Sequence, residues 1–87
     1  MIKAWSDSAW EDFEYWLHQD RKTLKRILFL IQDIERNGNT GIGKPERLKG
    51  DLSSYWSRRI DESNRIVYRI EGDVLKIVQC GSHYRDK

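Results

Sequence analysis

Six side chains in the second half of this sequence have the types needed to cut RNA without a metal ion. They supply a carboxylate, three cations, an imidazole and a phenol: Glu46, Lys49, Arg59, Arg65, His83 and Tyr84. In such a reaction a base takes the proton of the ribose 2′-hydroxyl, cations stabilise the charge that builds on phosphorus, and an acid protonates the departing 5′-oxygen. An aromatic ring can stack on a base and hold the attacking oxygen in line. Any charged chain of this size offers a similar set, so residue types alone do not decide the function.

Each of these residues also has an ordinary structural explanation. Glu46 could pair with a neighbouring lysine at the surface, where such pairs contribute little. Arg65 could anchor a carboxylate such as that of Glu62, and His83 could be a frayed terminal residue. Arg58, next to one of the candidate cations, we interpret as a solvated strand arginine.

Other site chemistries lack the residues that they need. His18, His83 and Cys80 are the soft or borderline metal donors of the chain, and they lack the paired spacings of zinc sites, so we expect no metal and no cofactor. No nucleophile motif surrounds Cys80, which we expect to pack or to lie at a sheet edge. His18 falls near the expected end of a helix, where a surface or capping role is favoured. The glycine-rich stretch 37–45 does not match a phosphate loop or a dinucleotide fingerprint.

Composition indicates a small globular protein. The 87 residues, 38% apolar and 34% charged, allow one hydrophobic core, so we expect a single domain over residues 1–87. One cysteine and the lack of a secretion signal favour a cytoplasmic location, and no stretch approaches the roughly 20 apolar residues of a membrane helix. The net charge of +2 is small, but one basic set could either contact phosphates or be solvated: Lys44, Arg47, Lys49, Arg58, Arg59, Arg65 and Arg69.

Two helices are predicted in the first half of the chain. An apolar run at residues 2–5 predicts a first strand, after which Ser6 or Ser8 can cap a helix that ends near Gln19. Asp20 offers a second cap, and apolar residues at steps of three and four predict a helix that stops at Asn37-Gly38. We interpret the following stretch, to residue 45, as a connector.

The second half predicts a sheet built from a hairpin. Strands are expected over residues 55–60, 65–71 and 74–80, with a shorter segment at 46–49 and a two-residue turn at Gly72-Asp73. This turn fixes a register that puts five apolar side chains on the core face: Ile66, Tyr68, Ile70, Leu75 and Ile77. A three-residue loop at 61–63 would place Arg59 opposite Arg65 on the other face. We expect an α+β fold in the order β-α-α-β-β-β, with both helices on one face of a mainly antiparallel sheet.

Four blocks in fixed order resemble the YoeB (Txe) toxin family of the RelE-like superfamily. They are Lys44-Pro45-Glu46-Arg47-Leu48-Lys49, Leu52-Ser53 with Trp56-Ser57-Arg58-Arg59-Ile60, Asn64-Arg65-Ile66-Val67-Tyr68, and His83-Tyr84. The opening residues Trp5-Ser6, Ala9-Trp10 and Tyr15-Trp16 fit the same family, so the resemblance spans nearly the whole chain. Three features depart from its pattern: Arg47 replaces a usual proline, Asn64 replaces a common histidine, and three residues follow Tyr84.

The resemblance implies a RelE-like fold and a toxin that enters the ribosomal A site and cleaves the mRNA there without a metal. It implies that Glu46 is the proton acceptor, His83 the proton donor and Arg65 the clamp on the transition-state phosphate. Lys49 and Arg59 would hold the mRNA backbone. Tyr84 would orient the nucleotide, and the cut would leave a 2′,3′-cyclic or 3′-phosphate and a 5′-hydroxyl.

The same resemblance implies which partners the chain has. They are the 70S ribosome with its mRNA and a YefM-like antitoxin, whose extended tail would cover the active site. A homodimer is expected by analogy, operator DNA would be contacted only through the antitoxin complex, and no membrane is involved. Two alternatives stay open: a non-cleaving module that acts by occupying the ribosome or a nucleic acid, since arginine-rich faces bind phosphates without chemistry, and a ribonuclease that needs no ribosome.

Overall fold

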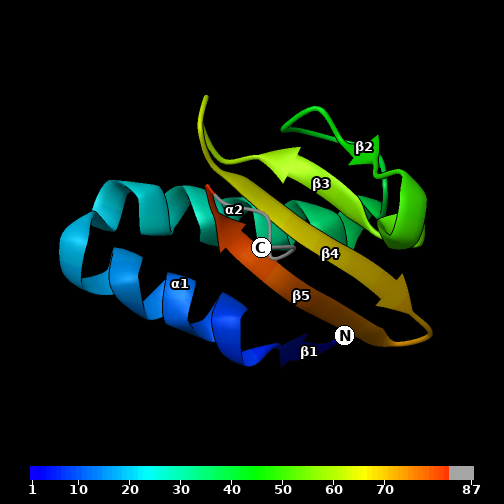
Figure 1. Ribbon diagram of the computed structural model, residues 1–87, viewed down its shortest axis with the longest axis horizontal. Coiled ribbons are helices and arrows are strands. Elements are labelled where there is room, and N and C mark those ends of the chain that lie inside the picture. Colours follow the sequence, from blue (N-terminus) through cyan, green and yellow to red (C-terminus); the bar gives the residue numbers. More distant parts are fainter. Residues whose placement is uncertain (83–87) are drawn as a thin grey trace.

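The computed structural model describes residues 1–82, which form a five-stranded sheet covered by two helices (Figure 1). The elements are β1 (Ile2–Trp5), α1 (Asp7–Gln19), α2 (Arg21–Asn37), β2 (Glu46–Arg47), η1 (a 3₁₀ turn, Gly50–Leu52), β3 (Trp56–Arg59), β4 (Arg65–Glu71) and β5 (Val74–Gly81). This order confirms the predicted α+β fold, and the short segment at residue 46 forms a strand of its own. Neither helix is long and apolar enough to cross a bilayer, as far as residues 1–82 show.

The sheet is mixed, with the strand order β1-β5-β4-β3-β2. β1 runs parallel to β5, and every other neighbouring pair is antiparallel. Ile70 lies opposite Leu75, and Arg59 lies opposite Arg65. The first pairing confirms the register predicted from the turn at Gly72-Asp73, and the second confirms the one predicted from the loop at residues 61–63.

A bulge in β5 shifts the register beyond the hairpin. Tyr68 pairs with Ile77 but Val67 pairs with Gln79, so Val78 is one extra residue in β5. The shift puts Cys80 opposite Ile66. Because of it, the Cys80 thiol joins the core, where it is fully buried.

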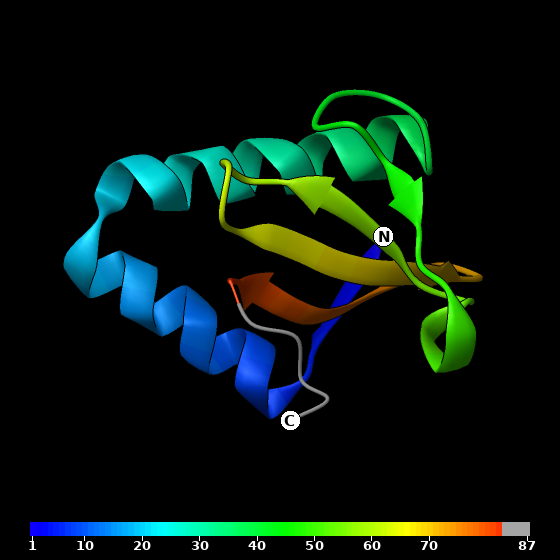
Figure 2. The same cartoon turned by 45° about the horizontal axis from the view of Figure 1, so that its top comes forward.

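The core lies between the sheet and the helices. The buried residues of α2 are Leu24, Ile27, Leu30, Ile31 and Ile34. All of them except Leu24 belong to one apolar cluster, to which α1 adds Ala9. The sheet supplies the five apolar residues predicted for this face, of which Ile70 is partly buried and the other four are in the cluster. Figure 2 shows the two helices diverging from their connection, with α2 running along the sheet and α1 returning toward β1.

Side chains of α1 and of its N-cap residue Ser6 complete the edge of β5 that β1 does not reach. The Ser6 hydroxyl donates to the Val78 carbonyl (3.2 Å), and the Asp12 carboxylate accepts from the Cys80 amide (3.0 Å). The Trp16 indole N–H donates to the Cys80 carbonyl (2.8 Å). These bonds satisfy backbone groups that would otherwise be unpaired at the sheet edge. They therefore fix the last residues of β5 against α1.

The predicted helix ends are confirmed. At the start of α1, the structure decides between the two serines that could cap the helix. Ser6, not Ser8, caps α1, because its hydroxyl accepts from the Ala9 amide (3.1 Å). Asp20 caps α2 by accepting from the amides of the second and third residues of that helix. α2 ends where Gly38 takes a φ of 70°, a conformation that favours glycine.

Candidate functional site

The strand register brings three of the predicted site residues onto the sheet face that points away from the core. Glu46 lies opposite Ser57, and Arg59, two residues further along β3, lies opposite Arg65. Side chains two residues apart on a strand share a face, and directly opposed Cβ atoms are about 4.5–5.5 Å apart. We call Glu46, Arg59 and Arg65 the arginine face. Lys49 lies two residues after β2, at the start of η1, and is exposed.

The other two predicted residues, His83 and Tyr84, lie outside the described residues. β5 ends at Gly81, which pairs with Arg65. In the chain, therefore, His83 follows two residues after the partner of Arg65.

Arg65 is held at one edge of its guanidinium. Its Nη1 donates to the carbonyl oxygens of Asp61 (2.8 Å), Glu62 (3.2 Å) and Asn64 (3.1 Å). The alternative that Arg65 pairs with the Glu62 carboxylate is not observed, because Arg65 contacts the backbone carbonyl of that residue instead. Within residues 1–82, its Nε and Nη2 have no hydrogen-bond partner. The Nη1 edge of the guanidinium is thus anchored, and its Nε–Nη2 edge is available to a ligand.

The turn that anchors Arg65 is organised by Asp61. Its carboxylate accepts from the amides of Ser63 (2.9 Å) and Asn64 (2.8 Å) and from the Asn64 side chain (3.0 Å). Partial burial acts to raise the pKa of Asp61, but these hydrogen bonds outweigh it and hold the pKa below its ordinary value. Asn64, which departs from the family pattern, therefore supports the turn that precedes Arg65.

Glu46, Lys49 and Arg59 present exposed side chains with no ion pair or side-chain hydrogen bond in the described part of the chain. The alternative that Glu46 pairs with a neighbouring lysine is therefore not observed. An unpaired carboxylate beside unpaired cations is a suitable arrangement for a substrate that carries both a hydroxyl and a phosphate.

The interpretation of Arg58 as a solvated arginine is wrong. Its side chain is fully buried and lies 2.5 Å from the Asp33 carboxylate of α2. Its Nε donates to the Tyr68 hydroxyl (3.3 Å), and three carbonyl oxygens accept from its Nη atoms: Gly38, Thr40 and Ile42. The hydrogen bond from Arg58 is the main cause that lowers the pKa of Asp33. A signal was available, because strand alternation puts Arg58 on the core face with Trp56, and a buried charge requires partners.

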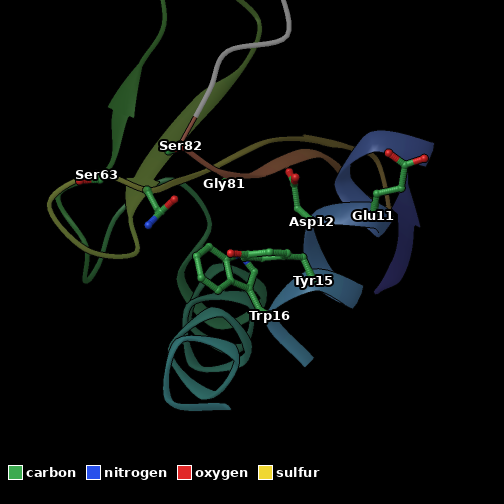
Figure 3. Close-up of a pocket in the computed structure, with 8 residues that line it drawn as sticks. Glu11, Asp12, Tyr15, Trp16, Ser63, Gly81 and Ser82 are labelled. Atoms are coloured by element: carbon green, nitrogen blue, oxygen red, sulfur yellow. The ribbon is translucent and has the colours of Figure 1, made fainter. Parts of the chain in front are cut away.

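A cavity of about 550 Å³ that sequence reasoning did not single out lies at the end of β5. Its described lining comes from α1, the turn before β4 and the end of β5: Glu11, Asp12, Tyr15, Trp16, Ser63, Asn64, Gly81 and Ser82. Figure 3 shows the Asp12 side chain directed toward Gly81, with the rings of Tyr15 and Trp16 on the other side. Its described lining has two carboxylates and no Lys or Arg, so it disfavours a phosphate. The arginine face is the better candidate for an anionic substrate.

Comparisons with known proteins agree along almost the full length of the chain. The family model of the YoeB-like toxin of bacterial type II toxin-antitoxin systems matches residues 5–84. The toxin YoeB of Streptomyces coelicolor is 54% identical over 81 residues, which are 93% of this chain and 96% of that protein.

Solved structures show the same likeness. The YoeB/ParE toxin from Agrobacterium tumefaciens superposes with a TM-score of 0.93 at 43% identity, covering 97% of this chain and 100% of that one. YoeB of Staphylococcus aureus, solved as a dimer and in a heterotetrameric complex with YefM, superposes with a TM-score of 0.91 at 42% identity, covering 97% of this chain and 98% of that one.

Proposed function

Because the chain belongs to the family of YoeB-like toxins of bacterial type II toxin-antitoxin systems, we propose that it is a ribosome-dependent endoribonuclease that cuts mRNA in the A site. The observation that carries this proposal is the arginine face, where the exposed carboxylate of Glu46 shares one face of the sheet with two arginines. The reaction is a transesterification that needs acid, base and cations but no metal.

Glu46 is the proposed base. Its exposed carboxylate takes the proton of the ribose 2′-hydroxyl while the 2′-oxygen attacks phosphorus. The bond from phosphorus to the 5′-oxygen then breaks, and His83 gives its proton to that oxygen. The products are a 2′,3′-cyclic phosphate, which water can open to a 3′-phosphate, and a 5′-hydroxyl end.

Arg65 is the proposed phosphate clamp. Its Nη1 edge is fixed by the turn carbonyls, so its Nε–Nη2 edge is aimed without further loss of side-chain freedom. That edge presents two parallel N–H donors, the arrangement that binds two phosphate oxygens at once. Charge that builds on the phosphate oxygens in the transition state would strengthen these bonds.

The remaining site residues are proposed to hold the substrate. Lys49 and Arg59 are exposed cations that would contact phosphates flanking the scissile bond, which positions the RNA without reading its sequence. Tyr84 would stack on or orient the nucleotide whose 2′-hydroxyl reacts.

The proposed partners are the ribosome with its mRNA, in the cytoplasm, and a YefM-like antitoxin that silences the toxin. Relatives from Staphylococcus aureus have been solved as a dimer and as a heterotetramer with YefM. We extend both forms of assembly to this chain, whose residues 1–87 would act as one domain. Operator DNA would be bound only through the antitoxin.

The chemistry of the RNA ends tests this function against the two alternatives. We expect new 5′-hydroxyl ends when the protein is added to translating ribosomes, seen as fragments that a polynucleotide kinase labels without prior phosphatase treatment. Ribosome stalling with no new ends would support a module that acts by occupancy. Equal cutting of naked RNA would support a ribonuclease that needs no ribosome.

A further inference from the structure

Arg58 and Asp33 together hold the loop that leads to Glu46. This loop joins α2 to β2, and Arg58 donates to its carbonyl oxygens at Gly38 (2.7 Å), Thr40 (2.8 Å) and Ile42 (3.1 Å). Asp33 holds the loop from the other side, because its carboxylate accepts from the Ile42 amide (3.1 Å). The loop is therefore wrapped around an ion pair in which Arg58 is fully buried and Asp33 is partly exposed.

Glycine lets the loop approach the ion pair closely. Gly41 has a φ of +129°, and a Cβ there would lie 2.0 Å from the Asp33 carboxylate and 3.2 Å from Arg58 Nη1. At Gly43 the carbonyl oxygen accepts from the Arg59 amide (2.7 Å), which ties the loop end to β3. The next residue, Lys44, has a φ of 53°, which is uncommon outside glycine. The path into β2 is thus set by contacts upstream of Glu46 and not by backbone preference alone.

β2 itself is too short to hold its own register. It has two residues, paired as Glu46 with Ser57 and Arg47 with Trp56. So short a pairing is marginally stable by itself, and a slip of one residue would move Glu46 to the opposite face of the sheet. Downstream of β2, the Leu48 amide donates to the Tyr55 carbonyl (2.9 Å). The loop contacts provide the constraint on the upstream side, where Glu46 lies.

We propose that Arg58 and Asp33 are positioning residues, whose ion pair keeps Glu46 on the arginine face through the loop at residues 38–45. This role is consistent with the known use of buried polar groups to specify register. It rests on the proposed function, since it requires Glu46 to be the base. Neither residue would touch the substrate, because Arg58 is fully buried and Asp33 lies on α2, which packs on the core face of the sheet.

The test compares cleavage by Arg58→Lys and Asp33→Asn with that of the unaltered protein on programmed ribosomes. Misplacing a reacting group by about 1 Å can cost about 10²-fold in rate, so we expect kcat to fall by about that factor while KM for the ribosome complex stays unchanged. Rates are normalised to the folded fraction measured by circular dichroism. Ile27→Val, a conservative change in the core away from the loop, controls for a general loss of stability.

A double-variant comparison separates positioning from any other effect. In a Glu46→Ala background there is no base left to position, so adding Asp33→Asn should produce no further loss of the residual rate. An equal further loss in that background, or wild-type kcat in folded Asp33→Asn and Arg58→Lys, would overturn the inference. If Glu46→Ala itself cleaves at the wild-type rate, Glu46 is not the base and the inference fails while the nuclease function stands. If the unaltered protein makes no cuts, the proposed function itself fails.

A pair of glycine variants keeps the inference testable if the charged variants do not fold. Gly41→Ala pushes a methyl group into the ion pair without changing any charge. Gly72→Ala also carries a positive φ, of 60°, but meets no atom within 4 Å. Both variants place alanine at a positive φ, and alanine is strained more at +129° than at the left-handed +60°. A loss of kcat in folded Gly41→Ala alone supports positioning by the loop, and equal kcat in both folded variants contradicts it.

Discussion

Substituting Arg58 by methionine removes a buried cation while keeping much of the length and the apolar stem of the side chain. The guanidinium is fully buried, contacts Asp33 at 2.5 Å, and donates to three loop carbonyl oxygens and the Tyr68 hydroxyl. Breaking a fully buried pair by removing one partner costs about 3–5 kcal/mol, because the remaining polar groups lose their partners. Water reaches the partly exposed Asp33 carboxylate, which places the expected cost at the lower end of this range. A protein of this kind has a total stability of about 5–15 kcal/mol. We therefore expect Arg58→Met to lose a large share of it.

Urea denaturation followed by circular dichroism measures this loss as a shift in the unfolding midpoint. Arg69→Met is the matched control, since Arg69 lies on the same sheet but is partly exposed and pairs with Glu71 at the surface. We expect little change in the control. A loss of less than about 1 kcal/mol for Arg58→Met would refute the argument, because that is the size of a single ordinary hydrogen bond.

The same ion pair gives the stability a pH dependence with a defined sign. The hydrogen bond from Arg58 lowers the pKa of Asp33 below its ordinary value of 3.8 in the folded state. A group with a lowered pKa stabilises the protein above its unfolded pKa, and the contribution is lost as the pH falls through the folded value. The midpoint difference between the unaltered protein and Arg58→Met should therefore narrow below about pH 3.8. A difference that widens in acid would contradict the pairing.

Three further substitutions test other parts of the account. Ser6→Ala removes the cap of α1 and should cost about 0.5–2 kcal/mol of stability in urea denaturation; no shift of the midpoint would contradict the capping role. Trp16→Phe removes the hydrogen bond to the Cys80 carbonyl and should cost about 1–3 kcal/mol, more than Trp10→Phe at a half-exposed position. Arg59→Ala should weaken binding to single-stranded RNA. A plot of the logarithm of the association constant against the logarithm of the salt concentration should become less steep by about 0.7. An unchanged slope in filter binding would show that Arg59 contacts no phosphate.

The fold followed from short-range patterns in the sequence. A two-residue turn at Gly72-Asp73 with alternating apolar residues on both sides defines a register, and the observed pairing of Ile70 with Leu75 agrees with it. Apolar residues at helical spacing predicted α2, and the glycine that follows them predicted where it ends. The arginine face followed too, because Arg59 and Arg65 are separated by a loop of the length that places them opposite each other.

What could not be predicted depends on contacts between distant parts of the chain. The bulge at Val78 has no strong local signal, so the burial of Cys80 in the core required the structure. Arg58 was assigned to solvent because its partner Asp33 is 25 residues away, on α2, and local sequence does not show which helix residue the strand meets. The cavity beside Trp16 is likewise formed by three segments that meet only in the folded protein.

Primer extension on an mRNA in a purified translation system tests the central claim most directly. The unaltered protein, Glu46→Ala and His83→Gln are compared, each with and without ribosomes, after circular dichroism has shown that the variants fold. The account predicts discrete cuts that need the ribosome, reduced by about 10²–10⁴-fold when the base or the acid is removed. Undiminished cutting by either folded variant would contradict the assigned roles, and ribosome arrest without cuts by the unaltered protein would contradict the nuclease itself.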